Sequence, residues 1–472
     1  MDYIVLLNGG RRTKRKKFKM NLLKSTRDEV LKELENGNLN ACVIGLGRVG
    51  LPTAAVLADS GVNVIGADIS SETVNIVNSG RSKYDDEPGL PQLVKKTVNQ
   101  GKLRATTEIA SAVSKSDFII VCVPTPVDEK KIPDYSAIID VSKIISNNVV
   151  KGSIVIIEST VGPGTVENLI IPLIEQNGLK AGKDFGVASC PERANPGEIL
   201  HSLRTVPRIV GGIDWKTVEA VTTFYEAVFN VEIIKVSDLK TANAVKLTEN
   251  IFRDTNIALM NELAILYEKL GIDVIKVIEA CTTKWNFAPH YPGPGVGGPC
   301  LPANPYYMIH EGVKVGYIPY LIRMAREVND RMPEHVIKLI TEALNEVKKH
   351  IKGSKIALLG VSYKADVRDL QMTPIKQIFN PLKKMGAKIS FYDPYFRGEN
   401  IFHTKSSSSY IDAVKDADCI VIGTAHKEFA QIDLEKIAKE ANMPAAIVDA
   451  KAVFSSSDIK NHGFSFRGIG RI

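Results

Sequence analysis

The chain has 472 residues, of which 44% are hydrophobic and 24% are charged, and its formal net charge is +7. This composition is typical of a soluble globular protein and argues against global disorder. At roughly 150 residues per domain the length predicts about three domains, and no apolar run approaches the ~18 residues that an integral membrane protein needs.

The positive charge is concentrated in residues 11–19, whose seven Lys and Arg side chains equal the whole excess. Such an arm could contact nucleic acid or anionic lipid. We expect instead a solvated extension with no nucleic-acid partner, because short charge runs are usually tails, and Met20 is an alternative first residue. The arm does not resemble a secretory signal, since no apolar segment follows it.

The six cysteines form no C-x-x-C pair, so we expect neither a zinc site, nor any other metal site, nor a disulfide framework. Cys42, Cys122 and Cys419 lie within apolar runs and are expected to be small buried hydrophobes. Free cysteines fit a reducing, cytoplasmic location.

From residue 41 onward, short β-branched runs alternate with segments of helical periodicity. This alternation predicts an α/β fold with a doubly wound parallel sheet covered by helices on both faces. The expected strands are at 41–45, 62–67, 117–123, 153–158 and 184–189.

Helical periodicity dominates the middle of the chain, from 213 to 350. Residues 238–270 have apolar side chains at helical spacing and neither Pro nor Gly, which predicts one long helix. Residues 318–350 are similar, with Pro333 predicting a kink or restart. Residues 286–305 are dense in Pro and Gly and are expected to form a loop.

Strand-like runs resume after Gly353, which predicts a second Rossmann-like lobe. Its expected strands are at 355–360, 388–392, 418–422, 445–448 and 464–467. The predicted organisation is a basic extension with a lead-in helix at 1–38, a first lobe at 39–212, a helical dimerisation region at 213–350 and a second lobe at 351–472.

The first expected strand runs directly into a G-x-G-x-x-G motif, and Asp68 ends the next strand. The glycines permit a tight turn, close backbone approach to a pyrophosphate, and close helix–strand packing. Asp68 would bind the ribose hydroxyls and repel a 2′-phosphate, which favours NAD over NADP. The predicted cofactor residues of this motif are Gly45, Leu46, Gly47, Arg48, Val49, Gly50 and Asp68.

The long helix carries Asn243, Lys246, Asn250 and Arg253, whose spacings place them on one helical face. A solvated face would show the same pattern, so these residues point to a site only in the company of a reactive group. Cys300, in a loop of glycines and prolines, is a candidate for that group.

An exposed cysteine near a lysine ammonium has its thiolate favoured, and a thiolate, an NAD and a lysine together suggest oxidation through a covalent sulfur adduct. Lys246 and Asn250 could stabilise the oxyanions that form. Glu192 is a candidate base for hydrolysis of the resulting thioester.

Together these motifs resemble the UDP-glucose/GDP-mannose dehydrogenase family, over about 40–470. The matching segments are G-L-G-R-V-G-L-P at 45–52, V-P-T-P at 123–126, S-T-V at 159–161, C-P-E-R at 190–193, K-L-T-E-N-I-F-R-D at 246–254 and G-P-G-V-G-G-P-C at 293–300.

The resemblance implies an NAD-dependent, four-electron oxidation of the C6 hydroxyl of a UDP-sugar. It implies Cys300 as nucleophile, Lys246 and Asn250 as oxyanion stabilisers, Glu192 in thioester hydrolysis, and Thr160 positioning water or the sugar hydroxyl. Pro124, Thr125 and Thr160 would also line the NAD site. The implied substrate-binding residues are Arg193, Arg253, Asn256, Gly297, Gly298, Tyr363 and Lys364. The second lobe would bind the UDP portion, and the chain would form a homodimer or higher homo-oligomer through the long helix.

The P-E-R motif and the F-R-D-x-N helix, with Arg253 and Asn256, resemble the N-acetylhexosamine branch of the family. The G-P-G-V-G-G loop favours UDP-N-acetyl-D-mannosamine as substrate. UDP-N-acetylglucosamine and then UDP-glucose are the alternatives.

Three positions depart from the family pattern. Ala303 and Asn304 stand where the family has Asp, often preceded by Lys or Val, and Asn304 cannot act as a base. Gln371 replaces an arginine, for which Arg368 is the nearest candidate substitute. These departures motivate an alternative, a catalytically weakened paralogue that binds NAD and a UDP-sugar.

Overall fold

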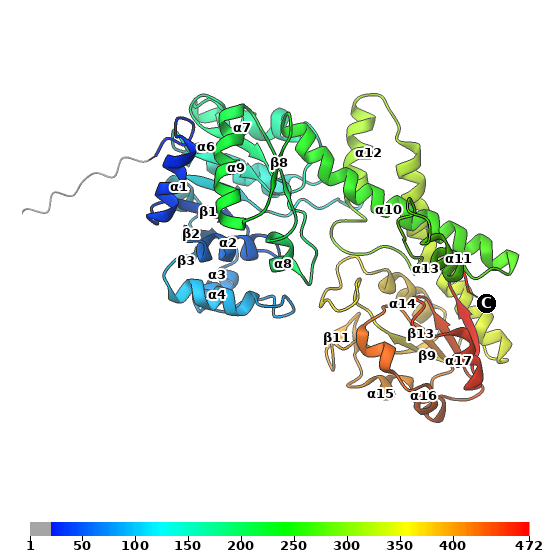
Figure 1. Ribbon diagram of the computed structural model, residues 1–472. Coiled ribbons are helices and arrows are strands. Elements are labelled where there is room, and N and C mark those ends of the chain that lie inside the picture. Colours follow the sequence, from blue (N-terminus) through cyan, green and yellow to red (C-terminus); the bar gives the residue numbers. More distant parts are fainter. Residues whose placement is uncertain (1–19, 472) are drawn as a thin grey trace, which may run out of the picture.

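Two large β-sheets, each in its own lobe, are linked by one long helix in the computed structural model, which describes residues 20–471 (Figure 1). The basic arm at 11–19 lies outside the described residues. The architecture confirms the predicted α/β class with two Rossmann-like lobes around a helical middle.

The first lobe contains an eight-stranded sheet in the order β3-β2-β1-β4-β5-β6-β7-β8. Its strands are β1 (Asn40–Ile44), β2 (Asn63–Ala67), β3 (Leu103–Thr106), β4 (Phe118–Val121), β5 (Ile154–Ile157), β6 (Gly186–Ser189), β7 (Arg208–Gly212) and β8 (Ile233–Lys235).

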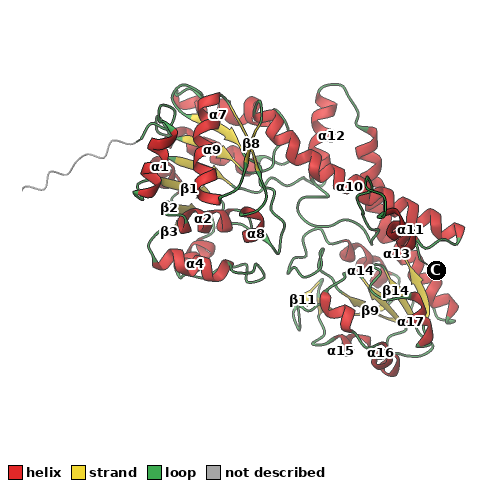
Figure 2. Ribbon diagram, in the orientation of Figure 1, coloured by secondary structure: helices red, strands yellow, loops and turns green. Residues whose placement is uncertain are grey.

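Helices cover both faces of this sheet (Figure 2). They are α1 (Arg27–Glu35), α2 (Gly50–Asp59), α3 (Ser71–Asn78), α4 (Leu90–Asn99), α5 (Ile109–Ser114), α6 (Ser136–Asn148), α7 (Ile171–Ile174), α8 (Ile199–Leu203) and α9 (Trp215–Phe229). Short turns of other helix types are η1 (Val166–Ile170) and η2 (Glu175–Asn177).

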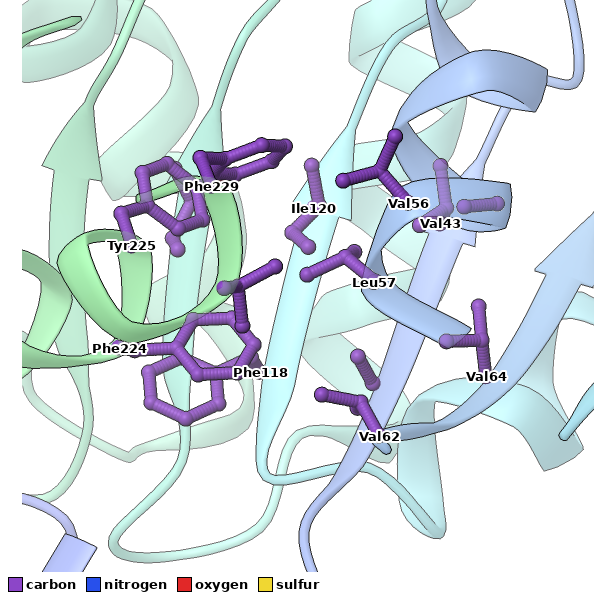
Figure 3. Packing of buried hydrophobic residues seen from close by; sticks show 14 of the residues in the cluster. Val43, Val56, Leu57, Val62, Val64, Phe118, Ile120, Phe224, Tyr225 and Phe229 are labelled. Carbon is purple, nitrogen blue, oxygen red and sulfur yellow. The ribbon is translucent and has the colours of Figure 1, made fainter. Parts of the chain in front are cut away.

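Alternate residues of the central strands enter two hydrophobic clusters on opposite faces of the first sheet. On one face the rings of Phe118 and Phe224 stack with their centroids 3.9 Å apart, beside Ile120 and Leu57 (Figure 3). Each such buried side chain contributes about 1.5–3 kcal/mol through burial. This packing fixes the strands whose carboxyl ends carry the predicted cofactor residues.

One strand pair departs from the predicted parallel sheet, because β6 and β7 are antiparallel. A parallel connection needs a crossover, usually a helix, that covers one face of the sheet. The segment between these strands forms only the short α8, which packs beside α2. The reversal brings the start of β7 to the edge where β6 ends.

The middle of the chain consists of α10 (Leu239–Leu270), α11 (Val274–Cys281), α12 (Asn304–Lys314) and α13 (Tyr320–Glu346). The predicted long helix is confirmed as α10, which begins where the Asp238 carboxylate accepts from the Thr241 N–H and ends at Gly271 with φ +69°. Its 32 residues span about 48 Å.

The predicted restart at Pro333 does not occur, since α13 continues through this residue. Met332 and Val336 on either side of it are buried in the core of the second lobe, and this packing holds the helix together.

The second lobe contains a five-stranded parallel sheet in the order β10-β9-β13-β14-β15. Its elements are β9 (Lys355–Leu359), α14 (Pro374–Lys384), β10 (Lys388–Tyr392), α15 (Tyr410–Val414), β13 (Cys419–Ile422), η3 (Lys427–Gln431), α16 (Leu434–Glu440), β14 (Ala446–Asp449), α17 (Ser456–Asn461) and β15 (Ser465–Gly468), with a small hairpin of β11 (Asn400–Ile401) and β12 (Thr404–Lys405).

Candidate active site

The glycine-rich turn joins the carboxyl end of β1 to the start of α2. Gly45 has φ +92°, and a Cβ there would lie 2.7 Å from the carbonyl oxygen of Cys122. A Cβ on Gly50 would lie 1.8 Å from the Gly45 carbonyl oxygen, so both positions require glycine. No atom lies within 4 Å of the Cβ position of Gly47, so the space beside its backbone is open. The turn therefore fits the close approach of a pyrophosphate.

Asp68, at the end of β2, holds this turn through its carboxylate. It accepts hydrogen bonds from the backbone N–H of Leu46 and of Ser70, each at 2.8 Å. Val49 caps α2. The predicted cofactor residues of the motif thus gather at the carboxyl ends of two neighbouring strands.

The other predicted cofactor residues follow β4 and β5, the next two strands of the sheet. The hydroxyl of Thr125 donates to the carbonyl of Thr160 at 2.7 Å, and Pro124 is exposed beside it. Because β1, β2, β4 and β5 are parallel neighbours, all these residues meet at one edge of the sheet.

Arg48 extends from the glycine-rich turn to the second lobe. Its guanidinium lies 3.0 Å from Asp86 and 3.6 Å from Asp369, and it donates to the carbonyl of Arg368 at 3.0 Å. The ring of Tyr84 lies beneath it, 4.9 Å away. The turn expected to bind the cofactor is therefore tied to the opposite lobe.

Cys300 lies in the loop between α11 and α12 with its side chain exposed. Its carbonyl accepts from the backbone N–H of Ala303 at 3.1 Å and of Asn304 at 2.9 Å. The expected loop at 286–305 therefore ends two residues early, where α12 begins.

The glycines before Cys300 pack against the second lobe. A Cβ on Gly298 would lie 2.6 Å from the ring of Tyr363, and one on Gly297 would lie 2.9 Å from the carbonyl oxygen of Met372. These two glycines, predicted to bind substrate, therefore allow atoms of the second lobe to pack closely against the loop. Tyr363 holds the cysteine loop against its own lobe.

Charged groups from both lobes influence the thiol of Cys300 electrostatically. Desolvation by the surrounding protein raises the pKa of Cys300, and the Lys246 ammonium opposes that rise. The carboxylates of Glu192 and Asp369 raise the pKa further. Lys246 is therefore the group that favours the thiolate.

Glu192 lies in the loop that follows β6. Desolvation raises its pKa to about 7, against the opposing charges of Lys246 and Arg208. A carboxyl group with this pKa can accept and release a proton near neutral pH, as a general base must. The structure thus brings Glu192, Lys246 and Cys300 within electrostatic reach of one another.

A buried ion pair that the sequence reading missed lies behind Glu192. The guanidinium of Arg208, at the start of β7, binds the carboxylate of Glu158, to which Tyr225 also donates at 2.7 Å. Nε of Arg208 lies 3.5 Å from the sulfur of Cys190. Charged residues inside two otherwise apolar strand segments were the available signal.

The polar face of α10 divides between structural and exposed residues. Asn243 is buried and donates to Ser189 at 3.2 Å. Lys246 and Asn250 follow along the same face, and the Asn250 amide donates to the side chain of Asn304. Arg253, one turn further, is exposed.

Two predicted substrate-binding residues form hydrogen bonds within the protein. Arg193 forms an ion pair with Glu249 and donates to the carbonyl of Pro207. The amide of Asn256 donates to the carbonyl of Phe252 at 2.7 Å.

Lysines of the second lobe face α10 and the first lobe. Lys364 donates to the side chain of Asn195 and to the carbonyl of Pro196, each at 2.8 Å. Lys451, which the sequence reading missed, follows β14, and its Nζ lies 2.8 Å from the Cβ position of Gly293. Desolvation lowers the pKa of both lysines, and the charge of Arg253 lowers it further. A lysine at the carboxyl end of a parallel strand was the signal for Lys451.

The loop that carries Tyr363 and Lys364 is anchored by a buried pair. Asp393 accepts from the Ser362 N–H at 2.9 Å and from Nε2 of His426 at 3.0 Å. Nδ1 of His426 accepts from the Asp366 N–H at 3.0 Å.

Arg368 of this loop does not take the place of the arginine that Gln371 replaces. Gln371 is exposed, and its carbonyl accepts from the Gly298 N–H at 2.9 Å. Arg368 pairs with Glu399 at 2.7 Å. Arg48, from the other lobe, is the cation beside Asp369.

Within residues 20–471, no helix is long and apolar enough to cross a membrane. The same residues contain no group of three or more His, Cys, Asp or Glu side chains placed to hold a metal ion.

Comparison with known families matches three models of the UDP-glucose/GDP-mannose dehydrogenase family along the chain. The NAD binding domain matches residues 39–229, the central domain 240–331 and the UDP binding domain 357–456.

Individual relatives match over nearly their whole length. The UDP-N-acetyl-D-mannosamine dehydrogenase of Pyrococcus horikoshii is 37% identical over 435 residues, covering 92% of this chain and 99% of that protein. The UDP-N-acetyl-D-glucosamine 6-dehydrogenase of Pseudomonas aeruginosa is 33% identical over 428 residues, covering 88% and 97%. A solved structure of UDP-D-ManNAc dehydrogenase from Pyrococcus horikoshii superimposes with a TM-score of 0.85 at 36% identity, covering 92% of this chain and 99% of that one.

Proposed function

Because the chain belongs to the UDP-glucose/GDP-mannose dehydrogenase family and is an NAD-dependent UDP-sugar 6-dehydrogenase, we propose that it oxidises UDP-N-acetyl-D-mannosamine to the uronic acid. The observation that carries this proposal is that the charges of Lys246 and Glu192 act on the thiol of Cys300, whose loop packs against Tyr363 of the second lobe. The name of the Pyrococcus relative supports the mannosamine substrate, and that of the Pseudomonas relative supports UDP-N-acetylglucosamine as the alternative.

NAD would be held by the turn from Gly45 to Gly50 and by Asp68, with Thr125 and Thr160 at the adjacent strand ends. Bound NAD⁺ supplies the hydride acceptor for both two-electron oxidations. The open space beside Gly47 is the feature of this chain that fits its pyrophosphate.

The Cys300 thiolate adds to the carbonyl carbon of the sugar aldehyde, forming a C–S bond while the carbonyl electron pair moves onto oxygen. Lys246 and the amide of Asn250 stabilise that oxyanion. After the second oxidation the sulfur carries a thioester, and hydrolysis returns the thiolate and releases the carboxylate.

Glu192 is the base for this hydrolysis, because its pKa of about 7 lets it take a proton from the attacking water. Thr160 positions that water or the sugar hydroxyl. The diphosphate is held by the cations Lys364, Lys451 and Arg253, of which the arginine influences both lysines electrostatically.

The experiment offers purified protein UDP-N-acetylmannosamine, UDP-N-acetylglucosamine and UDP-glucose separately with NAD⁺ and follows NADH absorbance. About two NADH per sugar, fastest with the mannosamine substrate, is the expected result. A preference for another sugar would move the proposal to that substrate. No turnover with any of them would favour the weakened paralogue that Asn304 and Gln371 suggest.

Cys300→Ser is expected to lower acid formation by about 10³-fold or more, because the hydroxyl is a far weaker nucleophile at neutral pH. Cys281→Ser, in α11 and outside the cleft, is the matched control and should keep full activity. Full activity of the Cys300 variant would remove the covalent route.

We further propose a homodimer or higher homo-oligomer formed through α10. Phe252, Leu259, Leu266 and Leu270 are exposed at spacings of seven, seven and four, which forms one apolar stripe along the helix. A second copy of this chain is the occupant we assign, because an equivalent stripe could pack against it about a two-fold axis. Leu259→Arg should reduce the mass seen in sedimentation equilibrium to that of one chain, while an unchanged mass would contradict this interface.

All six cysteines are free thiols, with Cys300 exposed. We therefore place the protein in a reducing, cytoplasmic setting, where a nucleophilic cysteine stays active.

A further inference from the structure

Arg48 joins the glycine-rich turn of the first lobe to the loop after β9 in the second lobe. Its guanidinium donates to the carbonyl of Arg368 at 3.0 Å, and its Nε lies 3.6 Å from the carboxylate of Asp369. The same loop carries Lys364 and Tyr363, which packs against the cysteine loop. A side chain of the turn expected to bind NAD therefore contacts the loop expected to bind UDP.

Asp86 of the first lobe reinforces this contact. Its carboxylate accepts from the backbone N–H of Arg368 at 3.2 Å and lies 3.0 Å from the Arg48 guanidinium. The side chains of Asp86 and Asp369 are only 6% and 7% exposed, so water screens their charges less than those of a surface ion pair. We call Arg48, Asp86, Arg368 and Asp369 the interlobe cluster.

The charge of Arg48 decides whether the two lobes attract or repel each other at the interlobe cluster. Its guanidinium lies 3.0 Å from Asp86, 3.5 Å from Glu87 and 3.6 Å from Asp369. Desolvation raises the pKa of Asp369, and the carboxylate of Asp86 raises it further. The backbone N–H of Gln371 and the charge of Arg48 act in the opposite direction. Removing Arg48 would thus leave like charges from opposite lobes close together.

Lys364 shows why the position of this loop matters for a substrate. Its ammonium donates to the side chain of Asn195 and to the carbonyl of Pro196, both in the first lobe and each at 2.8 Å. An ammonium has three N–H donors, so one remains for a phosphate oxygen. The place of that remaining donor depends on how the loop is held against the first lobe.

We propose that Arg48 is a positioning residue for the UDP-sugar: its side chain holds the loop after β9 against the first lobe, whereas the backbone of its turn serves NAD. This inference rests on the proposed binding of UDP by the second lobe. The turn keeps its shape without this side chain, because backbone atoms beside Gly45 and Gly50 define it. Arg48 therefore affects the UDP site of the opposite lobe more than the NAD site in which it lies.

The first test needs no nucleotide. Hydrogen–deuterium exchange, read by mass spectrometry, reports how often the backbone of residues 363–369 opens. In Arg48→Ala the exchange of this segment should be about tenfold faster, because a charge-assisted contact between the lobes is lost. Arg104→Ala, which removes the same charge from an exposed site on β3, should exchange like the wild type.

The second test compares the two nucleotides by isothermal titration. If the loop of Arg48→Ala holds its binding position about one tenth of the time, the Kd of UDP rises about tenfold. The Kd of NAD⁺ should change much less, since the backbone of the turn remains. Asp86→Ala removes the acceptor for the Arg368 N–H and lies outside both proposed nucleotide sites, so it should also raise the Kd of UDP.

Asp369→Asn separates the charge of the interlobe cluster from its shape. In the wild type this change removes a partner of Arg48, whereas in Arg48→Ala it removes a carboxylate that Asp86 repels. It should therefore favour UDP binding more in the Arg48→Ala background than in the wild type. A purely structural role does not predict this non-additivity.

Unchanged exchange of residues 363–369 in Arg48→Ala would overturn the interlobe role, and equal losses of NAD and UDP affinity would assign the Arg48 side chain to the cofactor site. Failure of the proposed function looks different. If the wild type forms no NADH from any UDP-sugar, exchange and UDP titration still decide the role of Arg48. If the wild type does not bind UDP, the positioning role fails together with the second-lobe site. Thermal unfolding identifies a folding defect, and Asp86→Ala serves if Arg48→Ala does not fold.

Discussion

The two lobes build their sites from different materials. In the first lobe the turn after β1 is shaped by backbone atoms, with a carbonyl 1.8 Å from where a Gly50 Cβ would lie. In the second lobe the loop after β9 is held by the side chains of Asp393 and His426, and lysines on separate loops extend toward Asn195 and Gly293. A site made of backbone fails as a whole when one glycine changes, whereas a site made of side chains loses its groups one at a time.

The sharpest test of that difference is Gly50→Ala. A methyl group there overlaps the Gly45 carbonyl, so the turn must open and NAD affinity should fall more than 100-fold. Titration of intrinsic fluorescence with NAD measures the affinity. Gly47→Ala is the matched control, because its methyl group meets no protein atom: it should leave the thermal midpoint unchanged while weakening NAD binding. Equal NAD binding by wild type and Gly50→Ala would contradict the claim that the first-lobe site depends on the backbone of this turn.

Glu192 tests whether the first sheet also supplies proton transfer. Below pH 7 its carboxyl holds a proton and cannot accept another, so kcat should fall as the pH drops through about 7. In Glu192→Gln, kcat should be about 100-fold lower and this acid limb should disappear. A pH–rate profile over pH 5.5–9 gives both quantities, and a limb that survives in the variant would assign the base elsewhere.

Lys451→Ala tests the second lobe. Removing one of several cations should weaken UDP binding about tenfold while leaving NAD affinity unchanged, which isothermal titration with each nucleotide measures. Lys427→Ala, at a highly exposed lysine of the same lobe, should bind UDP like the wild type. A complete loss of UDP binding would mean that this lobe, too, fails as a whole.

The smallest expected effect concerns the anchor of the second-lobe loop. Asp393 is buried, but the hydrogen bond from His426 and the backbone donors outweigh desolvation and lower its pKa. A carboxyl whose folded pKa lies below its unfolded value stabilises the fold above the unfolded pKa of about 4, and this stability is lost as the pH falls further. Asp393→Asn should therefore lower the free energy of unfolding by about 1–3 kcal/mol at pH 7. Urea melts from pH 7 to pH 3 should show the difference from wild type shrinking below pH 4; a constant difference would contradict the anchor's charge.

The same contrast explains what could be predicted from the sequence. The turn at Gly45–Gly50 is contiguous and has fixed spacing, and the long helix has a clear period, so both were predictable and the structure confirms the fold they imply. Lys451 and the Glu158–Arg208 pair carry a local signal, but their partners could not be predicted, because these are distant in sequence and meet only when strands pair. The packing of Gly298 against Tyr363 was hidden for the same reason, since it joins two lobes.

One consequence of α10 concerns insertions and deletions. Each residue added within a helix advances the remainder of that helix by about 1.5 Å and rotates it by about 100°. Asn250 donates to Asn304 of α12, and Asn261 donates to Asn329 of α13. Both ends of the segment from Asn250 to Asn261 are therefore in register with the helices that pack against them. The relative orientation of the lobes is thus encoded in the number of residues between these positions. Substitutions along the exposed side of α10 change one surface, but a single-residue indel there turns one nucleotide site away from the other.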